Sequence, residues 1–319
     1  EHCMREALTL ELGDVIIHAT AHFGQRRDPR GIIFLNSGAQ PRSSRGDLAV
    51  HVADSLAELG YQCFRVDLPG LGDSSGPLPA HYAQLYNEIQ NGCHAEPAGQ
   101  IVHRIISQFA LREVFFFGLC GGAATGLFLA GNLPRHMLGG LLLFDLPFEN
   151  IREYDSAPDT SHGNLQKTKV AGRLSILKRK LHDWLLSSRW EPQATTAYFA
   201  LKRVCSRLRP TSLPPHANRN LLEHLLAILK FQIPVLLVSA APIKNAPSDT
   251  VYFDYLKSCR FQSLHIECIL GTTHSFVENG GTAKVLGIVT SWLAARTDTA
   301  SDRSGELQPP TTSPNPESC

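Results

Sequence analysis

The chain has 319 residues, a mass of 35.0 kDa and a formal net charge of +1. Apolar residues make up 43% of it and charged residues 18%, which excludes a largely disordered chain and allows a sizeable core. The near-zero net charge gives no reason to expect nucleic acid as a partner. No stretch has the 18 consecutive apolar residues of a transmembrane helix, and the first residues lack the pattern of a secretory signal.

The eight cysteines are scattered, without a CxxC pair or a regular spacing, and most stand among apolar residues. This distribution predicts a cytoplasmic, reducing environment with mostly buried thiols, rather than a disulfide framework or a zinc site. No other motif of the sequence predicts a metal ion or a cofactor.

The first part of the chain alternates between strand patterns and helix patterns. Residues 7–20 predict a hairpin that turns at Gly13-Asp14, and 31–35 is a continuous apolar run, typical of a strand covered on both faces. A helix is predicted over 48–59, ending at Gly60. Further strands are predicted at 62–67, 114–117, 140–144, 234–238 and 264–269, and further helices at 101–109, 123–130 and 285–295.

This alternation predicts a mainly parallel, doubly wound α/β sheet that begins with antiparallel strands. The rhythm stops between Asp145 and Pro234, where a long polar stretch of helical character predicts an inserted lid. The end of the chain is rich in Pro, Ser, Thr and Asp, which predicts a disordered tail. We therefore expect a core in two parts, residues 1–146 and 217–296. Residues 147–216 are expected to form an inserted helical lid, and residues 297–319 a disordered tail.

A cysteine occupies the tight turn between a predicted strand and the helix that follows it. The segment Gly118-Leu119-Cys120-Gly121-Gly122 has the form of the G-x-S-x-G nucleophile elbow, with Cys in the position of Ser. Glycines allow the close approach of chain segments at such a strained turn, and a helix N-terminus favours the thiolate. We predict Cys120 as a nucleophile; the plainer interpretation is a buried cysteine beside a glycine-rich turn.

A general base and an acid are expected later in the chain. His274 follows the last predicted strand, where it is placed to act as a base towards Cys120. Three residues are candidates for the acid, and we rank Asp145 first, Asp249 second and Asp254 third. Asp145 ends the strand that follows the elbow helix, and its alternative role is to cap a helix or accept loop hydrogen bonds.

Backbone N–H groups are the expected donors of an oxyanion site. Gly121, directly after the nucleophile, is the first predicted donor. The second is expected from the small-residue loop 36–40, either from Gly38 or from Ala39. A tight turn without any catalytic part is the alternative for this loop.

The predicted lid is strongly basic. Between residues 165 and 210 there are eleven Lys and Arg and two acidic residues, a net charge of +9 against −8 for the rest of the chain. Such a surface suits an acidic acyl carrier protein or the phosphates of coenzyme A, whereas a solvated helix face or a membrane-surface helix are alternatives. The side chains that we expect to contact the substrate are Trp184, Trp190, Lys178, Arg179 and Lys180.

Together, the elbow, the histidine loop and the alternating elements resemble the α/β-hydrolase superfamily, over roughly residues 5–145 and 220–296. Segments 36–42 and 65–74 are similar to those of bacterial serine-aminopeptidase-like and exosortase-associated hydrolases. The resemblance implies an α/β-hydrolase fold with Cys120 as nucleophile, His274 as base and an acid from Asp145 or Asp249. The chain departs from the superfamily in its Cys for Ser and in having no carboxylate directly after strand 234–238, where the acid usually stands.

Cysteine in place of serine changes the expected chemistry. A thiolate attacks thioesters and activated esters readily, and the acyl thioester it forms stays activated towards an amine, alcohol, thiol or water. We therefore expect acyl transfer, cyclisation or thioester hydrolysis on an acyl group linked to a carrier protein or coenzyme A. A carboxylesterase for small esters and a non-catalytic binding protein of the same fold are the alternatives.

Overall fold

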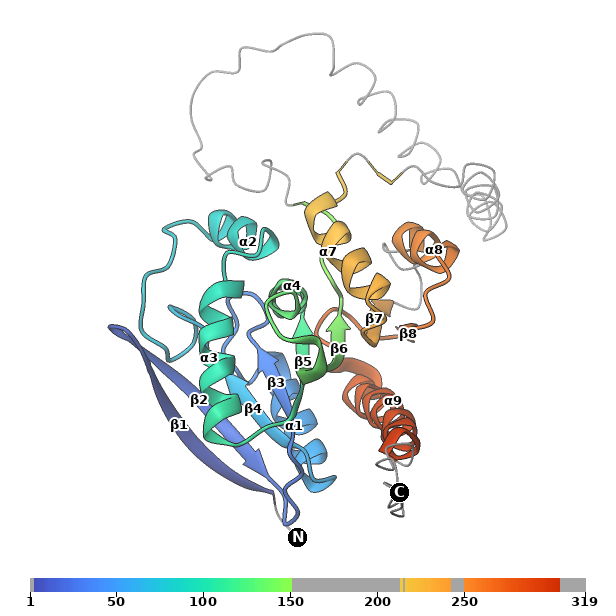
Figure 1. The fold of residues 1–319 in the computed structure, drawn as a ribbon. Coiled ribbons are helices and arrows are strands. Elements are labelled where there is room, and N and C mark those ends of the chain that lie inside the picture. The colour runs from blue at the N-terminus through green and yellow to red at the C-terminus, as the bar shows by residue number, and fades with distance from the viewer. Residues whose placement is uncertain (1–2, 151–212, 215, 242–249, 305–319) are drawn as a thin grey trace, which may run out of the picture. The chain divides into compact units, whose positions relative to one another are not determined.

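One eight-stranded sheet organises the part of the chain that this computed structural model describes, residues 3–150, 213–214, 216–241 and 250–304 (Figure 1). The chain divides into two units, residues 1–151 with 216–319 and residues 152–215, and the fold below is that of the first. The strands lie in the order β1 (Met4–Leu12), β2 (Val15–Phe23), β4 (Gln62–Val66), β3 (Arg30–Leu35), β5 (Glu113–Leu119), β6 (Leu138–Phe144), β7 (Val235–Ala241) and β8 (Leu264–Leu270).

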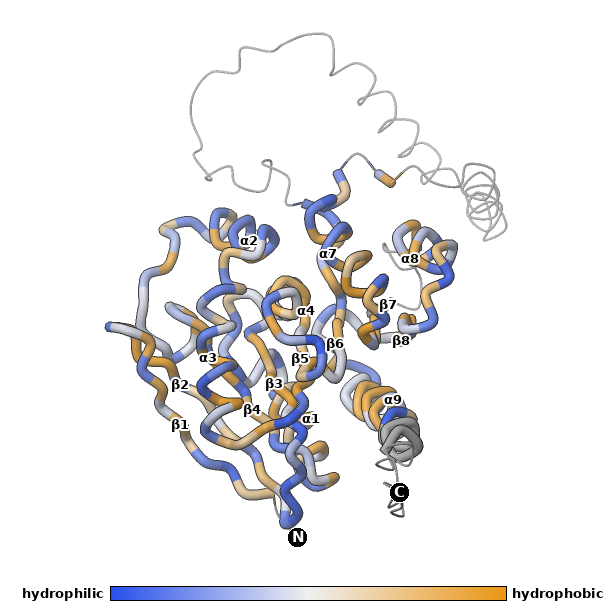
Figure 2. Tube along the Cα trace, in the orientation of Figure 1, coloured by the Kyte–Doolittle hydropathy of each residue, from blue (hydrophilic) through white to orange (hydrophobic). Residues whose placement is uncertain are grey.

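The sheet begins antiparallel and continues parallel, as the sequence predicts. β1 and β2 form a hairpin that turns at Gly13, which has φ 60°, and β2 pairs antiparallel with β4. Every other neighbouring pair is parallel. Because both faces of the inner strands are covered, all seven residues of β6 are buried and its sequence is a continuous apolar run. Figure 2 shows the same concentration of hydrophobic residues along the central strands.

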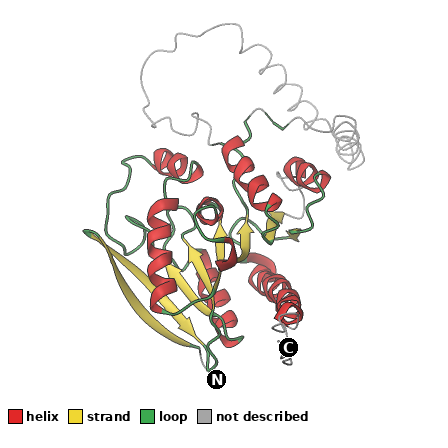
Figure 3. Ribbon diagram, in the orientation of Figure 1, coloured by secondary structure: helices red, strands yellow, loops and turns green. Residues whose placement is uncertain are grey.

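Helices cover both faces of the sheet (Figure 3). On one face, α1 (Leu48–Glu58) contacts α9 (Gly281–Ser304), and their apolar residues join the sheet in one core that includes Phe34, Phe117, Phe144 and Trp292. On the other face, α4 (Gly121–Ala130) contacts α2 (Tyr82–Gln90), α3 (Ala95–Gln108) and α7 (Arg219–Lys230). The shorter helical elements are α8 (Thr250–Ser258), η1 (Arg45–Asp47), η2 (Arg135–Met137) and η4 (Glu278–Gly280).

The helices differ from the expected ones in extent. α1 ends one residue before the predicted end, and Gly60 follows with φ 100°, a conformation that costs glycine little. α3 begins six residues before the predicted start, and α2 and α7 were not predicted. α9 runs to Ser304, so the helix enters the segment that composition predicts to be a tail. The rest of that tail and nearly all of the predicted lid lie outside the described residues.

None of the described helices combines the length and the apolar character that crossing a membrane requires.

Candidate active site

Cys120 lies on a strained turn between β5 and α4. Its φ of 54° and ψ of −114° place a non-glycine residue in a conformation that is rare for L-amino acids. Its backbone N–H donates to the carbonyl of Phe144 on β6 at 2.8 Å, and its carbonyl accepts from Ala124 in the first turn of α4 at 3.1 Å. The turn is therefore fixed to both a strand and a helix, as a nucleophile elbow requires.

Two glycines make this turn possible. A Cβ placed on Gly118 would lie 2.2 Å from the carbonyl carbon of Gly122, and one on Gly122 would lie 2.7 Å from the carbonyl oxygens of Leu35 and Asn36. These are distances that real side chains do not adopt, so only glycine allows α4 to begin this close to β5 and β3. The pattern of glycines in the sequence thus reflects the contact between helix and strands.

His274 and Asp145 meet across the ends of three strands. His274 stands in the loop after β8, and its Nδ1 lies 2.8 Å from Oδ2 of Asp145, directly after β6. The other oxygen of Asp145 accepts from the backbone N–H of Ala240 on β7 at 2.7 Å, and its own N–H donates to Val238 at 2.8 Å. The carboxylate is only 12% exposed, whereas the imidazole is 57% exposed. Asp145 therefore holds an accessible histidine in one orientation.

Cys120 also acts on the imidazole electrostatically. The hydrogen bond to Asp145 is the largest cause that raises the pKa of His274, and the influence of Cys120 adds to it, so that the pKa reaches about 10 although burial opposes the shift. Asp145 is hydrogen-bonded to His274, and Cys120 influences the charge of the same imidazole. A protonated imidazole beside a sulfur atom is the electrostatic partner of a thiolate.

The loop that carries His274 is held by Glu278, a residue that the sequence reasoning missed. The Glu278 carboxylate accepts hydrogen bonds from the hydroxyls of Thr273 at 2.8 Å and Ser275 at 2.9 Å. Backbone and hydroxyl donors together lower the pKa of Glu278 to about 2. Ser275 and Glu278 stand before α9 with the S-x-x-E spacing of a capping box. This spacing is the sequence signal from which the role of Glu278 could have been found. The two flanking residues of His274 are fixed in this way.

The loop with the predicted oxyanion donors lies against the start of α4. A Cβ on Gly121 would lie 2.9 Å from both the N and the Cα of Gly38, so the two backbones are in direct contact. Gly38 has φ 60° and continues into a turn in which the N–H of Gln40 donates to the carbonyl of Ser37. The structure therefore brings the Gly38–Ala39 segment and Gly121 together; their part in binding an oxyanion stays a prediction.

A buried aspartate holds this loop in place. Asp67 follows β4 and has a fully buried side chain, which accepts from the Asn36 amide and the Arg42 backbone N–H, each at 2.7 Å. It also pairs with the Arg42 guanidinium, and Oδ1 of the Asn36 side chain accepts from the N–H of Leu68 at 2.8 Å. Segments 36–42 and 65–74, which carried the family resemblance, are thus one structural network under the predicted oxyanion loop.

The remaining candidate residues are not brought to this site. Asp254 is exposed on α8, and in the described part of the chain the carboxylate at His274 is that of Asp145. Asp249 lies outside the described residues, and so do the predicted substrate contacts Trp184, Trp190, Lys178, Arg179 and Lys180. The prediction of mostly buried thiols was wrong for the described cysteines, because of six only Cys63 is buried. The others lie before β1, in turns beside helices, at the elbow and on the edge strand β8, where they stay accessible despite apolar neighbours in sequence.

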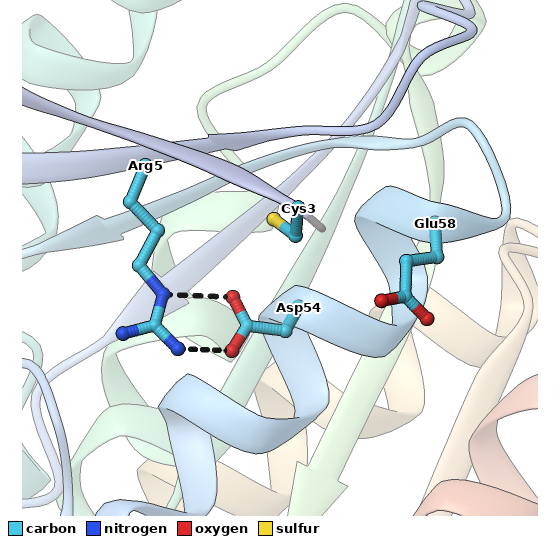
Figure 4. A pocket seen from close by; sticks show the side chains of 4 residues that line it. All are labelled: Cys3, Arg5, Asp54 and Glu58. Atoms are coloured by element: carbon cyan, nitrogen blue, oxygen red, sulfur yellow. Dashed lines mark hydrogen bonds and ion pairs between the residues drawn. The ribbon is translucent and has the colours of Figure 1, made fainter. Parts of the chain in front are cut away.

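A second group of cysteine, histidine and aspartate consists of Cys3, His22 and Asp54, the last of which belongs to α1. Figure 4 shows Cys3 and Asp54 with Arg5 and Glu58, the residues that line a pocket of about 440 Å³. The Asp54 carboxylate pairs with the guanidinium of Arg5 and lies 2.7 Å from Nδ1 of His22. Nε2 of His22 accepts from Nε of Arg65 at 2.7 Å, so Nδ1 carries the proton and donates to Asp54. The two nitrogens of His22 and the carboxylate are therefore already engaged.

These protonation states do not suit a metal ion. Burial is the largest cause that lowers the pKa of His22 to about 4, and burial together with Asp54 raises the pKa of Cys3 to about 11. The thiol is therefore neutral, the histidine nitrogen that faces the group bears a proton, and two arginines flank it. A cation needs thiolate and unprotonated imidazole as ligands. The cluster is a packing network that joins β1, β2, β4 and α1.

Comparison with known proteins agrees with the fold class. A model of the alpha/beta hydrolase fold matches residues 32–155. No curated protein sequence matches the chain. Similar solved structures include DcsB in complex with its substrate analogue, with a TM-score of 0.53 and 16% identity, covering 92% of this chain and 100% of that one.

Two further solved structures show the same likeness. Alpha/beta hydrolase domain-containing protein 10 from mouse has a TM-score of 0.52 and 15% identity, covering 91% of this chain and 99% of its own. A dienelactone hydrolase from Anabaena variabilis ATCC 29413 has a TM-score of 0.51 and 13% identity, covering 92% and 99%. At such identities the likeness is one of fold.

Proposed function

We propose that this chain, which has the α/β-hydrolase fold, is an enzyme that carries an acyl group covalently on Cys120. The observation that supports this most directly is the 2.8 Å bond between His274 and Asp145, on a histidine whose pKa Cys120 also raises, with the cysteine on a strained elbow. The non-catalytic alternative was motivated by a missing acid, and Asp145 provides a carboxylate 2.8 Å from His274.

The first half of the proposed reaction forms the acyl-enzyme. The sulfur of Cys120, as a thiolate beside the His274 imidazolium, attacks the acyl carbon, and the carbonyl electrons move onto the oxygen. The tetrahedral species then collapses, the bond to the leaving thiol or alcohol breaks, and His274 gives its proton to that leaving group. Asp145 keeps Nδ1 of His274 occupied throughout, so that Nε2 faces the sulfur.

The second half releases the acyl group. A water molecule or an acceptor nucleophile loses its proton to the now neutral His274 and attacks the thioester on Cys120. The C–S bond breaks and restores the thiolate and the imidazolium. During both halves, the backbone N–H of Gly121 and one from the Gly38–Ala39 segment are the proposed partners of the negatively charged oxygen.

Thioesters and activated acyl groups are the proposed substrates, because a thiol leaving group and an attacking thiolate are of similar basicity. An ordinary alkyl ester has a poorer leaving group. The tetrahedral species formed from it would therefore expel the Cys120 thiolate, and revert to the ester, more often than it would expel the alcohol. We propose an acyl carrier protein or coenzyme A as the carrier of the acyl group, on the strength of the eleven basic residues between positions 165 and 210. Transfer, cyclisation and hydrolysis all proceed from the same intermediate.

Intact-mass measurement of the whole chain tests the proposal. After mixing with butyryl-coenzyme A, with a butyryl thioester of pantetheine or with p-nitrophenyl butyrate, we expect one butyryl adduct on Cys120, formed faster from the thioesters. Cys120→Ala should form none, whereas Cys93→Ala, which removes an exposed cysteine from the α2–α3 turn, should behave as the unchanged chain. Equal turnover by Cys120→Ala would overturn covalent catalysis, and rapid turnover of the p-nitrophenyl ester alone would favour an esterase.

A further inference from the structure

The hydroxyl of Tyr86 lies directly over the predicted oxyanion loop. Tyr86 belongs to α2, and a Cβ built on Gly38 would lie 2.3 Å from its Oη and 2.8 Å from its Cζ. The backbone of Gly38 in turn lies against Gly121, the residue after the nucleophile. Gly38 is therefore enclosed between the first residue of α4 and a phenol group, and only glycine fits there.

The polarity of this hydroxyl is set by a second tyrosine. Tyr82, one turn earlier on α2, donates its hydroxyl proton to Oη of Tyr86 at 2.9 Å, and the two rings lie 4.6 Å apart. Because the Tyr86 oxygen accepts this bond, its own O–H is left to donate. Among the described residues, none accepts a hydrogen bond from the Tyr86 hydroxyl.

Tyr86 is also kept in its protonated form. Burial is the largest cause that raises the pKa of Tyr86 above its ordinary value, and the negative charge of Cys120 acts in the same direction. Because Gly38 contacts Gly121, the phenol lies beside the residue that follows the nucleophile. A neutral phenol at this place is a hydrogen-bond donor.

We propose that the Tyr86 hydroxyl donates a hydrogen bond to the acyl oxygen while negative charge develops on it, beside the backbone N–H of Gly121. Tyr86 is then a catalytic residue of the oxyanion site, supplied by a side chain from α2. Tyr82 is a positioning residue, which orients and polarises the Tyr86 hydroxyl through their 2.9 Å bond. The inference rests on the proposed acyl-enzyme function and adds a residue to it.

Two reactions of Cys120 separate an oxyanion donor from a group that acts on the thiol. Acylation by phenyl thiobutyrate passes through an oxyanion, whereas alkylation by iodoacetamide does not, and both are followed by mass on the peptide that contains Cys120. Tyr86→Phe removes one donor, which at other oxyanion sites costs 10²–10³ in rate; since backbone donors remain, we expect acylation to slow by about 10- to 100-fold. The alkylation rate should stay within about twofold, which also shows that the elbow is intact.

Two further Tyr→Phe variants complete the design. Tyr82→Phe keeps the Tyr86 donor but loses its polarising partner, so acylation should slow by only about two- to fivefold. Tyr61→Phe makes the same chemical change at the opposite ends of the strands, where the hydroxyl accepts from Arg30 at 3.2 Å, and should leave both rates unchanged.

The possible failures can be told apart. If Tyr86→Phe acylates as fast as the unchanged chain, the inference is overturned and the proposed function stands. If acylation and alkylation fall in parallel, Tyr86 acts on the thiol and the oxyanion assignment is wrong. If the unchanged chain forms no acyl adduct on Cys120 while iodoacetamide still labels it, the proposed function fails and this inference fails with it.

Discussion

His274 is the residue whose charge the site controls most directly. The hydrogen bond to Asp145 and the influence of Cys120 favour its protonated form and raise its pKa to about 10, against about 6.5 for an ordinary histidine. The stabilisation from this protonated form is fully present below about pH 6.5 and is lost as the pH rises through about 10. We expect the NMR signal of the His274 ring to show an imidazolium at pH 8, and Asp145→Asn to lower its midpoint. A midpoint near 6.5 in the unchanged chain would contradict this effect of Asp145 and Cys120 on His274.

Among single residues of the site, those that follow strands could be predicted from the sequence. Those whose place depends on how a helix packs could not. Cys120 and Asp145 directly follow strands that are visible as apolar runs, and His274 stands in the loop after the last strand, so their positions could be inferred. Tyr86 lies in a helix with only three buried residues in nine, too few to show a period. Its relation to Gly38 depends on how α2 packs, which no local pattern encodes.

The elbow between β5 and α4 depends on close approach of two elements. In Gly118→Ala, the new Cβ would lie 2.2 Å from Gly122, within the first turn of α4, and neither backbone can yield without breaking the turn. We expect a loss of about 3 kcal/mol or more in the free energy of unfolding, measured by urea denaturation. Gly287→Ala, in α9, meets no atom within 4 Å and should instead gain about 0.5–1 kcal/mol. Equal stability of the two variants would contradict this account of the elbow.

Element types were easier to predict than element ends. The strands β3, β5, β6 and β7 are buried apolar runs, because helices cover both sheet faces, and such runs are distinctive in sequence. The end of α9 was not predicted, because residues 297–304 have a polar composition that is typical of a tail. The apolar first half of α9, with Val285, Val289 and Trp292 in the core, anchors the helix to the sheet. Helical hydrogen bonding then continues beyond the packed residues.

For the whole molecule, His22 links folding to pH. Burial, with the charge of Arg65, lowers the pKa of His22 to about 4, whereas in the unfolded chain we expect about 6.5. Between these values the unfolded chain holds a proton that the folded chain lacks. The stabilisation from neutral His22 is therefore present above about pH 6.5 and is lost as the pH falls towards 4, by at most about 1.4 kcal/mol per pH unit.

Urea denaturation at several pH values checks this prediction. Between pH 6.5 and 4, the free energy of unfolding should fall less steeply in His22→Gln than in the unchanged chain. His81→Gln, which replaces an exposed histidine just before α2, should keep the original slope. The same slope in all three proteins would mean that His22 is protonated in the folded chain.

The sheet order also has a consequence in time. β6 hydrogen-bonds to β5 on one side and to β7 on the other, yet β7 begins about 90 residues after Asp145 in the chain. At about 5–20 residues per second, a ribosome would complete β6 some 5–20 seconds before β7. During that interval the apolar edge of Leu141, Leu142 and Leu143 has no neighbour on its β7 side, and an unpaired apolar edge is a site of aggregation. Fast synthesis and early binding of a chaperone would therefore affect the yield of this protein more than its final stability.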